Sequence, residues 1–270
     1  MTGTEEVVRT RINFFDSANP TTKVAVLNAG KRSYETHDVV VRNARLATDQ
    51  SGLEISGFML ARHESKVSDF RDKNWIETIY RAEVCELIGK LTGADLVIAF
   101  HGHIRDASAD VDPNVVRKPA HSAHVDYVED TFRKYAKKGL TEIHEDPGLW
   151  LRRRFCAFNI WRGLGPVEEL PLAVCDARSV TPSMLHFVDV EERAGSNDGF
   201  RGMLLQHDPS QRWFYYPDMQ PDEVLIFKQC DRDHCKPRWC PHTAIVIPGQ
   251  RPPERPRVSF DIRAIAFFKD

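Results

Sequence analysis

Hydrophobic residues recur with helical spacing in two stretches of the first half of the chain. In NWIETIYRAEVCELIGKLTG, residues 74–93, apolar side chains recur every three or four residues and Gly93 follows as a stop. The charged stretch YVEDTFRKYAKKGL, residues 127–140, predicts a second helix that ends at Gly139. Short apolar runs typical of strands lie at 6–15, 23–27 and 95–106.

The second half of the chain changes to short apolar and aromatic runs that are bounded by Gly, Pro and Asp. The predicted strands are 154–164, 170–180, 199–207, 212–217 and 222–230, and 242–248 and 257–268 close the chain. Several short strands in succession predict a barrel or sandwich, with the early helix packed on its outside. The expected fold class is therefore mainly β with flanking helices. No stretch has the composition of a linker, so a single domain is expected over residues 1–270.

Composition and charge narrow the possible functions. The chain has 270 residues, of which 41% are hydrophobic and 28% charged, and its formal net charge is −2. This balance gives no sign of a surface for nucleic acid or acidic membranes. No apolar run approaches 18 residues and no apolar leader is visible, so neither a membrane span nor a signal peptide is predicted. A cytoplasmic location and reduced cysteines are therefore expected.

One short motif suggests metal chemistry. In AHSAHVDYVED, residues 120–130, His124 and Asp126 are separated by a single residue. On a β-strand, residues i and i+2 project from the same side of the sheet. The imidazole and the carboxylate would then form half of a metal site, whereas a surface turn is the alternative. Non-haem iron oxygenases complete such a site with a second histidine and leave coordination positions open.

Four downstream histidines are candidates for the third ligand. His186 follows a predicted short helix start, His207 lies beside the turn-like DPSQ, and His234 lies in a charged loop. His242 opens HTAIVIP, a predicted strand whose other residues are mostly apolar. A polar residue at the mouth of a buried strand is the favoured ligand, and a capping or turn histidine is the alternative.

The last predicted strand has two chemically different faces. Arg257, Ser259, Asp261 and Arg263 alternate with apolar residues, so they share one face. Arginine binds carboxylates with two parallel hydrogen bonds, and this face would suit a dicarboxylate cosubstrate at a barrel mouth. The alternative is an edge strand whose polar face meets water.

Taken in order, these residues resemble a known family. The motifs His124-x-Asp126, His242 and Arg257-x-Ser259 occur together with HGHIRD (101–106) and FNIWRGLGPVEELPLAVCDARSV (158–180). The set is similar to iron(II)/2-oxoglutarate-dependent oxygenases. More narrowly, it resembles the hydroxylase/desaturase group of secondary metabolism, which includes cephamycin-type methoxylation proteins and gibberellin-desaturase-like fungal enzymes. The resemblance spans roughly 95–268, and residues 1–94 match only loosely, as a variable N-terminal cap with a helix would.

This resemblance implies a jelly-roll core, or double-stranded β-helix, over 95–268 with the metal at one mouth. It implies His124, Asp126 and His242 as ligands of Fe(II). Arg257 would hold the distal carboxylate of 2-oxoglutarate with help from Ser259, and Arg263 is the alternative or second anchor. The 14 residues between His242 and Arg257 require a loop that folds back, which leaves the choice of arginine open.

The resemblance also implies an oxidoreductase that uses O2 and 2-oxoglutarate. Such dioxygenases hydroxylate or desaturate a small-molecule substrate through a ferryl-oxo species, and need no catalytic side chain beyond the metal ligands. Arg105, Asn159, Trp161 and Arg162 are the candidate substrate-binding residues. Core packing for Trp161 and a structural ion pair for Arg105 are the alternatives.

Three other functions stay open at this point. Zinc would compete for His242 if it bound Cys230, Cys235, Cys240 and His234, although their C-x4-C-x4-C spacing differs from the usual C-x2-C pairs. A non-haem iron oxidase would use the same triad without 2-oxoglutarate. A non-catalytic barrel would act as an accessory protein. The sequence gives neither the substrate nor the oligomeric state.

Overall fold

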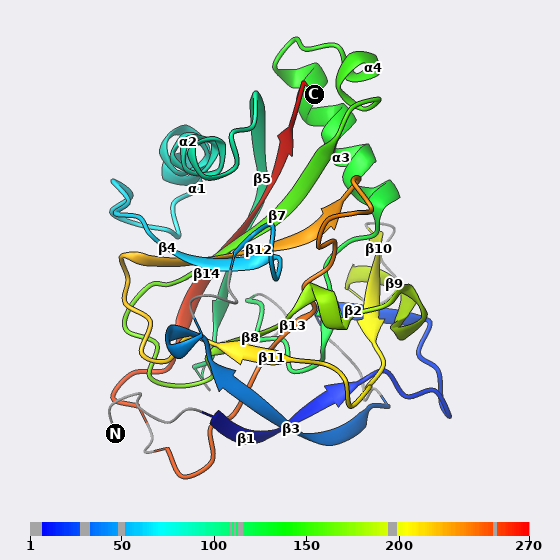
Figure 1. The fold of residues 1–270 in the computed structure, drawn as a ribbon. Helices are drawn as coiled ribbons and strands as arrows, with labels where there is room; N and C mark the ends of the chain where they lie inside the picture. The colour runs from blue at the N-terminus through cyan, green and yellow to red at the C-terminus, as the bar shows by residue number, and fades with distance from the viewer. Residues whose placement is uncertain are drawn as a thin grey trace.

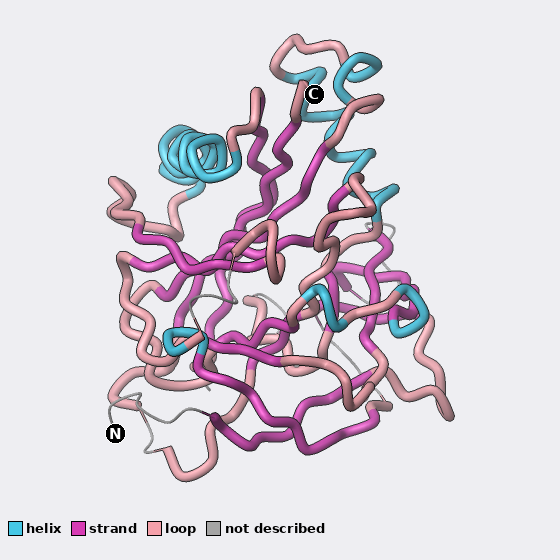
Figure 2. Tube along the Cα trace, in the orientation of Figure 1, coloured by secondary structure: helices cyan, strands magenta, loops and turns pink. Residues whose placement is uncertain are grey.

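The protein is seen here as a computed structural model. It describes residues 7–27, 33–47, 52–108, 110, 112, 116–193, 199–250 and 253–269. Within them, a sheet of nine strands faces a sheet of five strands, and helices lie at the periphery (Figures 1 and 2). The predicted β-rich class with flanking helices is confirmed. Residue 6, the first of the predicted strand 6–15, lies outside the described residues.

The nine-stranded sheet is assembled from distant parts of the chain. Its order is β1 (Val7–Phe14), β3 (Glu35–Asn43), β11 (Trp213–Tyr215), β8 (Leu172–Cys175), β13 (His242–Ala244), β6 (His124–Val125), β10 (Gly199–Leu205), β9 (Leu185–Arg193) and β2 (Lys23–Leu27). Two very short strands, β13 and β6, lie at its centre and pair antiparallel with each other. Each also pairs with a second neighbour, so the sheet fixes both strands from two sides.

The five-stranded sheet is antiparallel throughout. Its order is β4 (Phe58–Arg62), β12 (Glu223–Asp231), β7 (Phe155–Gly163), β14 (Val258–Phe267) and β5 (Leu96–Asp106). Every residue of β7 and β12 is buried. The last strand, β14, lies between β7 and β5, so it is not an edge strand whose polar face meets water.

The early helix covers the outer face of the five-stranded sheet. It consists of α1 (Lys73–Trp75), a π-helical turn over Ile76–Tyr80, and α2 (Arg81–Thr92). Its buried side chains pack against the apolar face of β14: Tyr80, Val84 and Ile88 contact the cluster of Phe260, Ile262, Ala264 and Ala266. Gly93 ends the helix with a left-handed φ of 70°. The predicted helix, its stop and its outside position are confirmed (Figure 1).

The second predicted helix continues past its expected end. Helix α3 spans Glu129–Glu142, so Gly139 lies inside it. A Cβ atom on Gly139 would lie 2.6 Å from Cδ1 of Ile98 on β5. The glycine therefore permits close packing of α3 on this strand, and it is not a helix stop. A short helix, α4 (Pro147–Trp150), follows with Asp146 as its N-cap.

Three observed strands were not predicted from the sequence. They are β3, β4 and β9, and His186 lies in β9 just after a short 3-10 helix at Pro182–Met184. Of these, β3 and β4 lie before residue 94 and extend both sheets, together with β1 and β2. The segment expected as a cap therefore contributes strands as well as a helix. The single-domain organisation stays a prediction.

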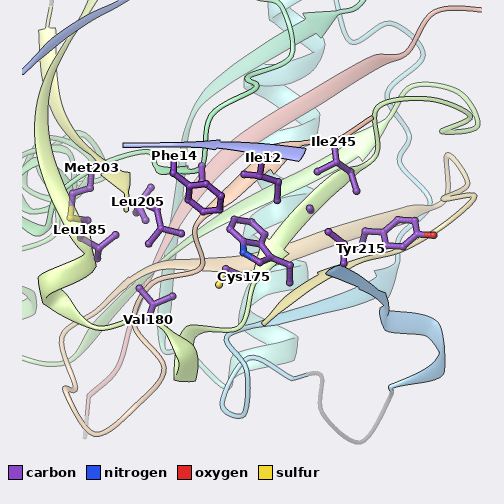
Figure 3. Packing of buried hydrophobic residues seen from close by; sticks show 14 of the residues in the cluster. Ile12, Phe14, Cys175, Val180, Leu185, Met203, Leu205, Tyr215 and Ile245 are labelled. Carbon is purple, nitrogen blue, oxygen red and sulfur yellow. The ribbon is translucent and has the colours of Figure 1, made fainter. Parts of the chain in front are cut away.

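The two sheets enclose one apolar layer, and a second layer lies on the other face of the nine-stranded sheet. Between the sheets, Trp161 and Phe227 pack with Val174 and Phe214. Figure 3 shows the second cluster, in which side chains such as Ile12, Phe14 and Leu205 meet. Val125 belongs to this second cluster, so its neighbours His124 and Asp126 project to the opposite face.

The described residues also bear on the cysteines and on membrane-spanning helices. All six cysteines are free thiols. Among the helices of the described ranges, none combines the length and apolar character that a membrane crossing requires.

Candidate metal centre

The sheet brings two distant histidines next to each other. His124 lies in β6 and His242 opens β13, and the two residues are direct partners in the antiparallel pairing of these strands. Asp126 follows β6 on the same side as His124. One ligand atom from each of these three residues lies within 4.8 Å of the others. The strand pairing therefore assembles the set that the sequence analysis selected.

The three side chains converge through specific atoms. Nε2 of His124 lies 3.6 Å from Oδ1 of Asp126, and Nε2 of His242 lies 3.9 Å from the same oxygen. Nδ1 of His124 lies 2.8 Å from the carbonyl oxygen of Ser122, to which it donates. This hydrogen bond selects the tautomer whose Nε2 carries a free lone pair. The arrangement thus presents two imidazole nitrogens and one carboxylate oxygen.

Burial and neighbouring charges set the protonation states of the site. Burial and the nearby His124 lower the pKa of His242 to about 3, so its imidazole is neutral at physiological pH. Burial alone would raise the pKa of Asp126, but Arg263 and the two imidazoles hold it well below its usual value. A neutral imidazole and an ionised carboxylate are the forms that bind a divalent metal. Two histidines and one carboxylate fit non-haem Fe(II).

Asp126 is held in place by three side chains. Asn159 on β7 donates from Nδ2 to Oδ2 of Asp126 at 2.8 Å. Arg263 on β14 donates from Nε to the same oxygen at 3.2 Å, and its Nη2 lies 3.1 Å from Oδ1. The backbone N–H of Asp126 donates to Oε1 of Gln229 at 2.9 Å. These contacts fix the direction in which the carboxylate points.

A second buried carboxylate, Asp261, continues this network. Its Oδ1 accepts from Nη1 of Arg263, and its Oδ2 accepts from Nε of Arg105 at 2.7 Å. Arg105 also donates from Nη1 to the carbonyl oxygen of Lys118. The predicted polar face of the last strand thus points into the space between the sheets, while its apolar face packs under the helix.

Arg257 differs from Arg263 in what surrounds its guanidinium. Its Cζ lies 5.5 Å from the ring centroid of Trp161, and its Nη1 donates to the carbonyl oxygen of Leu170. Burial and the nearby Arg105 lower the pKa of Arg257 to about 9. Within the described residues, Nε of Arg257 and Oγ of Ser259 are buried without a hydrogen-bond partner. A fully buried cation next to an unsatisfied hydroxyl suits an anionic ligand.

A cavity of about 630 Å³ opens beside the three converging side chains. Apolar residues of β2, β9 and β10 line part of it: Val24, Val188, Val190 and Leu204. His124 and Asp126 line it as well, together with the cations Arg105, Arg117, Lys118 and Arg263. Such a volume accommodates a drug-sized molecule.

The remaining candidates lie in other surroundings. Arg162 points to the outer face of β7, where Nη2 lies 2.6 Å from Nδ1 of His63 and the guanidinium lies over the rings of Tyr80 and Phe70. This face packs against the helix, so the structure does not bring Arg162 to the centre. His186 stacks on Phe15, and His207 stacks on His37.

The alternative zinc site is not assembled. Cys235 is exposed, whereas Cys230 and Cys240 are buried. Among the described residues, the only group of three or more histidine, cysteine, aspartate and glutamate side chains with metal-binding geometry is His124, Asp126 and His242. His242 therefore belongs to the iron-type set.

Sequence reasoning missed two polar contacts of the centre. Asp261 was placed on the polar face of the last strand but given no role, and Gln229 was not selected. The sequence offered no specific signal for Gln229, because its strand also carries the polar residues Glu223, Lys228 and Asp231. Arg105, one partner of Asp261, lies on β5, and Asp126, the partner of Gln229, follows β6. A single sequence does not give those contacts.

Comparisons with known proteins agree with this geometry. Residues 10–267 match the family model described as YDMC, an oxidoreductase/YMDC permease-like domain. The chain is 28% identical to the hydroxylase/desaturase efuI of Hormonema carpetanum, over 97% of this chain and 96% of that protein. It is 30% identical to the Fe(II)/2-oxoglutarate-dependent dioxygenase nvfI of Aspergillus novofumigatus, over 87% of this chain and 84% of that protein.

A solved structure extends the likeness to three dimensions. The iron and alpha-ketoglutarate-dependent endoperoxidase NvfI superposes with a TM-score of 0.83 at 27% identity, covering 97% of this chain and 98% of that chain. The likeness therefore includes the whole jelly-roll fold and is not limited to the metal-binding motifs. The chain belongs to the YDMC oxidoreductase family and, with these fungal hydroxylase/desaturases, to the iron(II)/2-oxoglutarate-dependent oxygenases of secondary metabolism.

Proposed function

We propose that His124, Asp126 and His242 hold one Fe(II) in a dioxygenase that uses 2-oxoglutarate and O2 to hydroxylate or desaturate a small molecule. The observation that carries this proposal is the meeting of three ligand atoms, from two segments more than 100 residues apart, within 4.8 Å. Two histidines and one carboxylate leave coordination positions free for a cosubstrate. The names of the fungal relatives support the same chemistry.

In this proposal the side chains position the reactants. Iron(II), 2-oxoglutarate and O2 together supply the oxidant that attacks a C–H bond. Asn159 and Arg263 hold Oδ2 of Asp126, and Oδ1, which Nη2 of Arg263 also contacts, faces the two imidazoles. The hydrogen bond from His124 to Ser122 keeps Nε2 of this histidine available.

We assign the distal carboxylate of 2-oxoglutarate to Arg257, with Ser259 as a hydrogen-bond donor. The unsatisfied Nε and Oγ atoms of these residues support the assignment. Arg263 is a poorer anchor because Nε and Nη2 already bind Asp126 and Nη1 binds Asp261. We therefore propose that Arg263 positions Asp126 and does not bind the cosubstrate.

We propose that the substrate occupies the cavity beside His124 and Asp126. The apolar side chains of β2, β9 and β10 suit a largely apolar skeleton. Arg105 lines this cavity and is the proposed polar contact to the substrate. Two other residues expected to bind substrate have partners in the centre, since Asn159 holds Asp126 and Trp161 lies beneath Arg257.

Several finer points stay predictions. The choice between hydroxylation and desaturation depends on which C–H bonds of the substrate lie near the metal. The relative NvfI is described as an endoperoxidase, so oxygen insertion of another kind is a second outcome within the same site. A cytoplasmic location and the absence of a nucleic-acid partner also stay predictions.

Iron-dependent consumption of 2-oxoglutarate tests the proposal. Purified protein with Fe(II), 2-oxoglutarate and air is expected to form succinate slowly even before the substrate is known. His124→Ala is expected to abolish this turnover, whereas His207→Ala, which alters a histidine stacked on His37, is the matched control. Iron binding without succinate formation would favour a non-haem iron oxidase that uses no 2-oxoglutarate. If the protein binds no metal, the proposal is wrong and a non-catalytic accessory protein is the better interpretation.

A further inference from the structure

Asp261 is a buried carboxylate that lies one step away from the proposed iron ligands. It is on the inner face of β14, two residues before Arg263, where it pairs with Trp161 on β7 and His103 on β5. Only 2% of its surface is exposed. Burying a carboxylate is costly unless cations and hydrogen bonds compensate it, so its partners indicate what it does.

The two oxygens of Asp261 hold two different arginines. Oδ2 accepts from Nε of Arg105 at 2.7 Å, and Oδ1 accepts from Nη1 of Arg263. Arg105 lines the cavity, and Arg263 binds Asp126 through its other nitrogens. A chain of buried charges therefore runs from the cavity wall through Asp261 to the proposed ligand Asp126.

The charges along this chain matter for metal binding. Arg263 contacts both oxygens of Asp126, so by itself it would cancel the only formal negative charge among the three ligands. The imidazole ligands add no negative charge, so a divalent cation would then meet a nearly neutral site. Asp261 binds the same guanidinium, so Arg263 neutralises less of the negative charge of Asp126. Asp261 also holds the Arg263 side chain in its position between the two carboxylates.

We propose that Asp261 is a positioning residue that preserves the charge and direction of Asp126 for Fe(II) and fixes Arg105 in the cavity wall. The proposal rests on the function proposed above. Outer contacts of this kind typically change metal affinity by about 10- to 100-fold when they are removed. Asp261 touches none of the three ligands directly, so its effect passes through Arg263.

Asp261→Asn tests the proposal because asparagine keeps the size and removes the charge. Fe(II) affinity is measured anaerobically against a competing chelator, with circular dichroism to confirm folding. We expect Fe(II) to bind at least about 10-fold more weakly than in the wild-type protein. Unchanged Fe(II) affinity in the folded variant would overturn the proposal. Failure of the wild-type protein to bind Fe(II) would instead overturn the proposed function.

Asp231→Asn is the matched control. Asp231 is also fully buried and also binds two cations, Arg154 and Lys228, but it contacts neither Arg263 nor Asp126. Its loss should lower thermal stability and leave Fe(II) affinity unchanged. An equal loss of Fe(II) affinity in both variants would mean that any buried carboxylate matters, and the specific role of Asp261 would be wrong.

Arg105→Gln keeps the test decisive if Asp261→Asn does not fold. Without Arg105, Asp261 pairs with Arg263 alone and neutralises more of its charge. More of the negative charge of Asp126 is then available to bind Fe(II). We expect Fe(II) to bind a few-fold more tightly than in the wild-type protein, and unchanged affinity would count against the proposal. A purely structural network predicts weaker binding, and that result in a folded protein would contradict the proposal.

Discussion

At the scale of single residues, Arg257, which directly precedes the last strand, and Arg263 within it have distinct surroundings that their spacing does not reveal. Arg263 is satisfied by two carboxylates, whereas Arg257 is equally buried but faces an aromatic ring and a backbone carbonyl. Burying a cation is unfavourable, and the lowered pKa of Arg257 reflects this cost. A bound carboxylate would remove the cost, so the unsatisfied arginine is the better anchor for a dicarboxylate.

Replacing each arginine separates these roles. We expect Arg257→Ala to weaken 2-oxoglutarate binding by roughly 30-fold or more, because truncating one partner of a buried charge pair costs about 2–5 kcal/mol. We expect Arg263→Ala to weaken Fe(II) binding first, because Asp126 loses the side chain that fixes the direction of its carboxylate. Isothermal titration with each ligand checks both effects. The opposite pattern would show that the cosubstrate is anchored by Arg263.

At the scale of elements, the sequence predicted which side chains share one face of a strand better than it predicted which strands pair with each other. The alternation in β14 correctly separated Ser259, Asp261 and Arg263 from the apolar residues under the helix. Helix periodicity likewise found α2 and its glycine stop. The end of α3 was wrong because Gly139 serves a packing contact with Ile98 that lies outside the local sequence. The pairing of β6 with β13 has no local signal, since these strands have two and three residues.

The two faces of β7 lead to an element-scale prediction. Asn159 projects into the centre, but Arg162 projects to the helix side, where it binds His63. Arg162→Met should therefore lower the free energy of unfolding by about 1–3 kcal/mol through lost hydrogen bonds, and leave Fe(II) and 2-oxoglutarate affinities within about two-fold. Chemical denaturation and ligand titration check the two parts. A large loss of ligand affinity with normal stability would show that Arg162 acts in the binding site and would contradict the prediction.

At the scale of the whole molecule, two facing sheets bury several histidines and charges around one cavity. Burial and the cations Arg117 and Arg263 lower the pKa of His103 on β5 to about 2. The folded protein therefore keeps this imidazole neutral where the unfolded chain, with an ordinary pKa near 6.5, takes up a proton. Acid consequently favours the unfolded state.

This difference predicts a pH dependence of stability. As the pH falls from 6.5 toward 4, His103 should reduce the free energy of unfolding by up to about 1.4 kcal/mol per pH unit. His103→Gln should make the dependence shallower in this window, which urea denaturation at several pH values can measure. An unchanged slope in the variant would mean that His103 is protonated in the folded state as readily as in the unfolded chain.

The central claim is that three side chains from distant segments bind one Fe(II) with room beside it for 2-oxoglutarate. Anaerobic addition of 2-oxoglutarate to the Fe(II)-loaded protein tests it most directly. We predict a weak visible absorption band that appears with both components, is lost in His242→Ala, and requires much more 2-oxoglutarate in Arg257→Ala. A spectrum that stays flat while iron is demonstrably bound would contradict the account.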